Sequence, residues 1–170
     1  GIARWNGSTW SALDPDQYAA VGALVVFDDG SGPALYAGGY FTDLSGPGST
    51  EYIARWNGTS WSSVGSGPNG EVLALTVFDD GSGPALYAGG EFTSAGGAPA
   101  NRIARWNGTS WSALGSGMND SVLALAVYDD GSGSKLYAGG FFTSAGGVPA
   151  NCIARWDGAA WSALGSGLGS

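Results

Sequence analysis

The chain has 170 residues, of which 32 are glycine and eight are tryptophan, and its formal net charge is −8 with only six lysine and arginine residues. Such acidity disfavours nucleic acid and anionic membranes as partners, because a negative surface repels phosphate groups. Histidine is absent and Cys152 is the only cysteine, which excludes Ser–His and Cys–His nucleophile pairs, a disulfide framework and a His/Cys zinc site.

The chain opens on part of a sequence unit that then recurs three times. Ile-Ala-Arg-Trp stands at residues 2–5, 53–56, 103–106 and 153–156, in steps of 51, 50 and 50 residues. Asp-Asp-Gly-Ser-Gly and Leu-Tyr-Ala-Gly-Gly recur with the same spacing in the three later units. One supersecondary unit has therefore been repeated along the chain.

Each full unit predicts four short strands, which we call A to D and describe in the last unit. Residues 122–127 form an apolar run typical of a buried strand A, and the turn sequence 129–133 leads to strand B at 135–138. A Gly-Gly pair ends strand B, where we expect a bulge or a close backbone approach, and a polar loop follows. Residues 153–156 form strand C, and an Asp-Gly hairpin connects it to strand D at 161–164.

Four antiparallel strands in a unit of about 50 residues predict an all-β protein of the β-propeller type. We expect one repeat domain over residues 1–170, with a half blade at 1–14 and blades at 21–65, 71–115 and 121–165. Propellers close with about four to eight blades. Three and a half blades therefore predict either part of a longer propeller or assembly with other copies, since an open strand edge is a template for pairing.

The units resemble Kelch repeats in the Gly-Gly pair that closes the second strand, in an aromatic residue late in the third and in a tryptophan that opens the fourth. They look most like the tandem repeats of uncharacterised secreted bacterial proteins and of cell-polarity cortical markers. This resemblance implies an extracellular or cell-surface scaffold. The aromatic positions are Trp56, Trp106 and Trp156 in the third strand, and Trp61, Trp111 and Trp161 in the fourth.

Tryptophan and arginine recur at fixed places in every unit. In the Asn-Gly hairpin, alternation puts Trp56 and Trp61 on one sheet face and Arg55 on the other. The tryptophans are expected to fill the space between blades, with a platform for sugar rings as the alternative. The residues predicted to maintain the blades are Arg4, Arg55, Arg105, Arg155, Trp5, Trp10, Trp56, Trp61, Trp106, Trp111, Trp156 and Trp161.

The arginines are expected to bind carboxylates of the Asp-Asp-Gly-Ser-Gly turns, with an acidic ligand as the alternative. Within each turn, an aspartate should cap its own backbone while glycine takes a positive φ. Calcium binding is the competing interpretation, but the spacing differs from that of a calcium loop, so no metal or cofactor is predicted. The available partners are Asp28, Asp79 and Asp129, or their neighbours Asp29, Asp80 and Asp130.

Strand directions predict two rims, one made of the A–B and C–D turns and the other of the longer B–C and D–A loops. We call these the turn rim and the loop rim. Departures from the repeat concentrate on the loop rim, where scaffolds usually bind ligands. The candidate ligand-binding residues are Asp14, Asp16, Tyr18, Asp43, Glu51, Tyr52, Glu71, Glu91 and Asp120.

These features favour a non-catalytic scaffold that assembles with itself or binds protein. Its expected partners are other copies or the remainder of a longer propeller, with a glycan or another protein as further candidates and no membrane insertion. A multivalent lectin is the main alternative, because near-identical blades suit repeated weak binding. A glycoside-active enzyme is the weaker one, because no spacing selects a carboxylate pair. Cys152 is interpreted as a neutral substitution.

Overall fold

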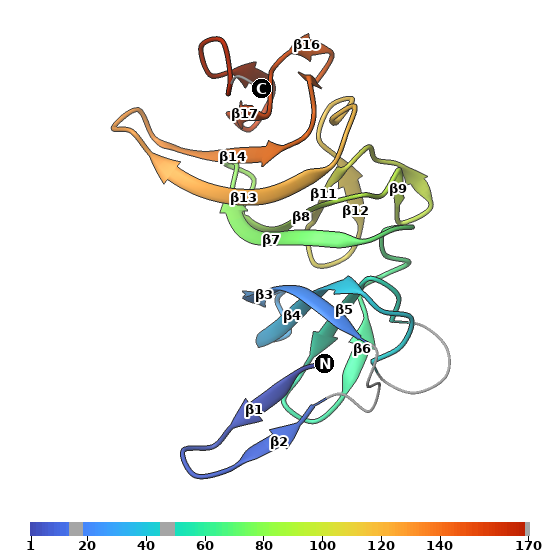
Figure 1. Ribbon diagram of the computed structural model, residues 1–170. Helices are drawn as coiled ribbons and strands as arrows, with labels where there is room; N and C mark the ends of the chain where they lie inside the picture. Colours follow the sequence, from blue (N-terminus) through green and yellow to red (C-terminus); the bar gives the residue numbers. More distant parts are fainter. Residues whose placement is uncertain (14–18, 45–49, 169–170) are drawn as a thin grey trace.

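The computed structural model describes residues 1–13, 19–44 and 50–168. Within them, a two-stranded hairpin precedes three four-stranded antiparallel sheets that follow one another along the chain (Figure 1). The described residues contain no helix long and apolar enough to span a membrane. The protein is thus all-β and built from β-propeller blades, as its repeat predicts.

The four repeated strands have nearly the same bounds in every unit. The N-terminal hairpin consists of β1 (Ala3–Trp5) and β2 (Trp10–Ala12). The first blade contains β3 (Ala20–Asp28), β4 (Pro33–Tyr40), β5 (Ile53–Trp56) and β6 (Trp61–Ser63). The second contains β7 (Val72–Asp79), β8 (Pro84–Gly90), β11 (Ile103–Trp106) and β12 (Trp111–Ala113). The third contains β13 (Val122–Asp129), β14 (Ser134–Gly140), β17 (Ile153–Trp156) and β18 (Trp161–Ala163).

The B–C loop, which the sequence indicates to be polar and irregular, contains a small hairpin in the second and third blades. Its turn in the second blade is Gly96-Gly97, with φ values of 63° and 80° that suit a tight two-residue turn. Strands of two residues are too short to show alternation in a sequence, which is why they were not predicted. These strands are β9 (Ser94–Ala95), β10 (Ala98–Pro99), β15 (Ser144–Ala145) and β16 (Val148–Pro149).

Adjacent blades meet along their first strands, and β7 lies beside both β3 and β13 (Figure 1). The Gly-Gly pair at the end of strand B makes this approach possible. A Cβ placed on Gly89 would lie only 2.5 Å from Cγ1 of Val122 in the next blade, and a Cβ on Gly90 would overlap the Glu71 carbonyl beside a bulge in β7. The predicted close approach is confirmed, whereas the bulge lies in strand A, between Val72 and Ala74, and not in the Gly-Gly pair of strand B.

The hydrophobic core is divided into clusters that lie between neighbouring blades. The cluster between the first two blades combines Phe27 and Ile53 of one with Val72, Trp106 and Trp111 of the other. Equivalent clusters join the N-terminal hairpin to the first blade and the second blade to the third. Because burial is made at these interfaces, the stability of each blade depends on its neighbours.

Candidate functional site

The tryptophan that opens each fourth strand ties its blade to the unit before it. The indole Nε1–H of Trp111 donates a hydrogen bond of 2.8 Å to the carbonyl of Val64, and its ring packs on Trp106 with centroids 5.5 Å apart. The same bond runs from Trp61 to Leu13 at 2.6 Å and from Trp161 to Leu114 at 3.0 Å. In these three blades the tryptophan is part of the contact between blades.

Burial decides which tryptophans could meet a ligand. Trp61, Trp111 and Trp161 are 6 to 8% exposed, so they present no free ring face to a sugar. In the N-terminal hairpin, the equivalent Trp10 is 70% exposed and Trp5 is 49% exposed. Among the tryptophan pairs that the structure describes, the platform predicted from the sequence is therefore accessible on this hairpin alone.

The repeated arginine binds the second aspartate of its own blade's A–B turn. Arg55 Nε lies 3.1 Å from Asp29 Oδ2, and Arg55 Nη2 donates a hydrogen bond of 2.6 Å to Ser31 Oγ. The Nε–H does not point at the carboxylate, so this contact is a charge attraction rather than a hydrogen bond. The Tyr36 hydroxyl donates to Asp29 Oδ2 at 2.8 Å and completes the network.

The first aspartate of the turn caps the backbone. Asp28 Oδ1 accepts hydrogen bonds from the N–H groups of Gly30 and Gly32 at 2.9 and 3.0 Å, and both glycines have a positive φ. Both aspartates are therefore engaged in holding the turn. Among the described residues, no group of three or more His, Cys, Asp and Glu side chains is placed to hold a metal ion.

The arginine network loosens along the chain. In the second blade Arg105 Nε lies 3.3 Å from Asp80 Oδ2, much as in the first. In the third blade the ion pair joins Arg155 Nη1 to Asp130 Oδ2 at 3.8 Å, and both side chains are more than one third exposed. Arg4 has no ion pair with any described residue.

Burial, hydrogen bonds and charge in this network shift the pKa values of an aspartate and a tyrosine in opposite directions. Partial burial raises the pKa of the Asp80 carboxyl, but hydrogen bonds from Ser82 and Tyr87 and the charge of Arg105 together lower it below 3.8. Burial and the bond to Asp80 raise the pKa of Tyr87 above 10.0. The folded state thus favours a charged aspartate and a neutral tyrosine.

We therefore expect stability to fall at both ends of the pH scale. The contribution of Asp80 is present above pH 3.8 and is lost as the pH falls through its lowered pKa, whereas that of Tyr87 is lost as the pH rises above 10.0. Tyr87→Phe should lower the free energy of unfolding by about 1 kcal/mol at neutral pH. It should also reduce the fall in the free energy of unfolding at acid and at alkaline pH. Urea unfolding across pH measures this. Tyr137→Phe is the matched control, and an equal effect there would contradict the prediction.

Contacts between segments establish the two rims. On the turn rim, Gly108 of the second C–D turn approaches the carbonyl of Asp29 in the first A–B turn. On the loop rim, Asn119 of a D–A loop accepts hydrogen bonds of 2.9 Å from the backbone of Thr143 and Ser144 in a B–C loop. The predicted grouping of turns and loops is confirmed.

The candidate ligand-binding residues that the structure describes are distributed along the loop rim rather than gathered at one point. Glu91 lies between the second and third blades and accepts a bond of 3.2 Å from the Ser121 hydroxyl, while the Ser121 backbone N–H donates to Asp120 at 2.7 Å. Tyr52, with φ 61°, packs on Tyr40 at 6.2 Å between centroids. Asp43 accepts a hydrogen bond from the Thr50 hydroxyl. Glu51 and Glu71 lie on described loops, whereas Asp14, Asp16 and Tyr18 lie outside the described residues.

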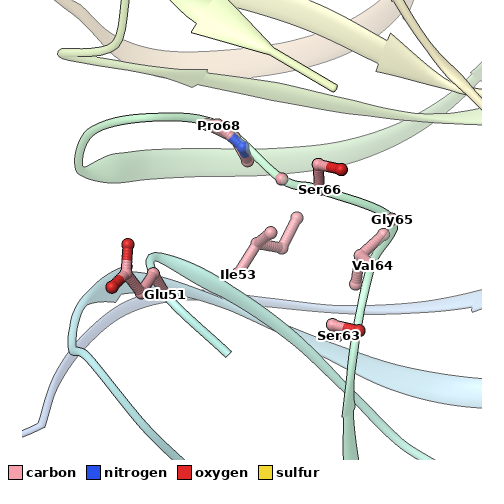
Figure 2. A pocket seen from close by; sticks show the side chains of 8 residues that line it. Glu51, Ile53, Ser63, Val64, Gly65, Ser66 and Pro68 are labelled. Atoms are coloured by element: carbon pink, nitrogen blue, oxygen red, sulfur yellow. The ribbon is translucent and has the colours of Figure 1, made fainter. Parts of the chain in front are cut away.

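A pocket of about 340 Å³ opens beside Glu51, at the junction of the first and second blades. Ile53 points into it from β5, and residues 63–68, which lead from the first blade to the second, form the opposite wall (Figure 2). The carboxylate of Glu51 lies at the edge of the pocket (Figure 2). Glu51 is a candidate from the sequence because it departs from the repeat, whereas nothing in the sequence marks residues 63–68 as a wall.

The fold and the contacts between blades define a repeat protein built from β-propeller blades. A family model described as a domain of unknown function (DUF5122) beta-propeller matches residues 86–109, which run from β8 into the turn after β11. No curated protein and no solved structure matches the chain. The match supports a propeller-type repeat, whereas an interaction role and the resemblance to Kelch repeats and to secreted proteins stay predictions.

Proposed function

We propose that this protein is a non-catalytic scaffold whose first and last units each pack against a further blade, supplied by a second copy or, as the alternative, by the remainder of a longer propeller. The supporting observation is that the hairpin β1–β2 carries the tryptophan pair of a blade interface without a partner blade among the described residues. Trp10, equivalent to Trp61 and Trp111, is 70% exposed, and its indole N–H has no acceptor in the described part of the chain.

The third blade carries the complementary half of such an interface. The carbonyls of Val64 and Leu114 each accept a tryptophan N–H and also the N–H of a glycine three residues later. The Leu164 carbonyl accepts only the Gly167 N–H within the described residues, which leaves one lone pair for Trp10 of another copy. The contact between copies would therefore continue an interface that the chain already makes between its own blades.

Exposure of the first-strand aromatics supports the same arrangement. Phe27 and Phe78, each covered by the next blade, are 4% exposed, whereas the equivalent Tyr128 of the third blade is 62% exposed. Tyr128, whose equivalents Phe27 and Phe78 fill interfaces between blades, is thus available on the outer face of the third blade. The resemblance of the repeats to those of secreted proteins supports an assembly outside the cell or on its surface.

Trp10→Ala tests the proposal. A buried tryptophan at an interface contributes about 2 kcal/mol or more, so this change should raise the dissociation constant for self-association about 30-fold. Sedimentation equilibrium over a range of concentrations measures the constant. Phe141→Ala is the matched control, since it removes another exposed ring, 67% exposed, on the loop rim. A monomer of 17.0 kDa at all concentrations, or equal weakening by both changes, would contradict assembly with a second copy.

A further inference from the structure

The pocket beside Glu51 exists because the first blade lacks a clamp that both later blades have. In the second blade the side-chain amide of Asn101 donates to the Ser116 carbonyl at 3.0 Å, and the Met118 N–H donates to the Asn101 carbonyl at 3.1 Å. In the third blade Asn151 makes the same two bonds, with Ser166 and Leu168. These paired bonds close the D–A connection onto the B–C loop.

Two substitutions remove both bonds in the first blade. Glu51 stands where the other blades have asparagine, so its carboxylate has no N–H to donate to the Ser66 carbonyl. Pro68 stands where they have Met118 and Leu168, and proline has no backbone N–H.

The backbone separates as a result. A Cβ placed on Gly117 would overlap the Asn101 carbonyl, whereas a Cβ on the equivalent Gly67 would lie 3.7 Å from the Glu51 carbonyl. The connection keeps the bond that both junctions have to the next blade, which runs from the Gly96 N–H to the Gly67 carbonyl at 2.8 Å here and from Gly146 to Gly117 at 2.8 Å in the next. The connection thus stays attached to the second blade while it is separated from the Glu51 carbonyl.

We infer that this pocket binds a primary ammonium group carried on a short aliphatic stem. Glu51 supplies a negative charge, and the Ser66 carbonyl, which has no donor among the described residues, supplies a neutral acceptor. Ile53 and Val64 lie beneath the pocket and are only 1% and 3% exposed, so the stem would rest mainly on the backbone of residues 63–68. An ammonium has three N–H donors and no acceptor, which matches a site that offers acceptors and a charge of opposite sign.

The lining disfavours other ligand classes. It contains no lysine, arginine or aromatic side chain, so it suits neither an anion nor the stacking of a sugar ring. The net charge of −8 raises the concentration of cations near the protein. A lysine side chain of a peptide and a free diamine share the required chemistry, and the experiment separates them.

Titrations followed by amide NMR shifts test the inference with two probes, Nα-acetyl-lysine N-methylamide for a peptide lysine and cadaverine for a free diamine. At least one should produce saturable shifts at the amides of Ile53, Gly65 and Gly67. Glu51→Gln should weaken binding about tenfold, since hydrogen bonds to charged groups are the strong ones. Glu71→Gln changes the net charge equally but lies outside the pocket lining, so it should leave the affinity unchanged.

Each outcome bears on the inference. Binding of only the lysine amide identifies a peptide as the source, and binding of only cadaverine identifies a free amine. Equal binding of the Nε-acetylated amide, or equal weakening by both glutamine variants, would overturn the ammonium site. So would full binding by the Glu51→Asn, Pro68→Met double variant, in which the clamp should close the pocket. Trp10→Ala should bind as the parent does, so this test is independent of self-association.

Discussion

Trp111→Ala is expected to lower the free energy of unfolding by about 3 to 5 kcal/mol, the range for removing a buried tryptophan. The change leaves a cavity beside Trp106, deletes the hydrogen bond to Val64, and so weakens the contact between the first two blades. Urea unfolding followed by circular dichroism measures the loss.

The repeat supplies its own control. Trp10→Ala removes the same side chain at the equivalent position, but Trp10 is 70% exposed, so we expect a change within about 0.5 kcal/mol. The comparison requires a protein concentration at which the monomer predominates, because self-association would add stability. Equal losses at both positions would mean that the tryptophan stabilises its own hairpin rather than the contact between blades.

Gly89→Ala is expected to destabilise the protein by about 1 to 3 kcal/mol, although it adds a single methyl group. The new Cβ would lie 2.5 Å from Cγ1 of Val122, a β-branched side chain that is fully buried and cannot rotate away. The second and third blades must therefore move apart. Gly38→Ala should act in the same way against Val72, since the distance there is also 2.5 Å.

Gly139→Ala is the matched control, since the nearest described atom to its Cβ position is 3.8 Å away. We expect little change in the free energy of unfolding, or a small gain from reduced flexibility of the unfolded chain. Thermal unfolding of the three variants at one concentration is sufficient for the comparison. If Gly139→Ala destabilised as much as Gly89→Ala, the glycines would serve strand B itself and not the packing of blades.

The strand pattern could be predicted closely because each unit repeats the same local signals. Strand C, predicted at 153–156, coincides with β17. Strand A, predicted at 122–127, extends to Asp129 because the ladder continues to the Asp129–Ser134 pair at the turn. The β9–β10 hairpin could not be predicted, since it is fixed partly by an isolated bridge from Ala95 to Pro68 of the preceding connection.

The partner of each arginine illustrates a choice that only geometry could make. Two adjacent aspartates were available to Arg55, and local chemistry allows either one. The structure commits Asp28 to the glycine N–H groups of its own turn, which leaves Asp29 to face Arg55 and Tyr36. Alternation along the strands then explains why the tryptophans lie on the opposite face.

The sequence by itself determined the all-β class, the four strands of each blade, the two rims and the exclusion of His-dependent chemistry, because these depend on periodicity and residue type. Tertiary structure decided which equivalent residues are buried, since burial depends on whether a neighbouring blade is present. It also decided where the pocket opens. Glu51 and Pro68 are 17 residues apart in the sequence, and their joint effect follows only from the loops that the fold brings together.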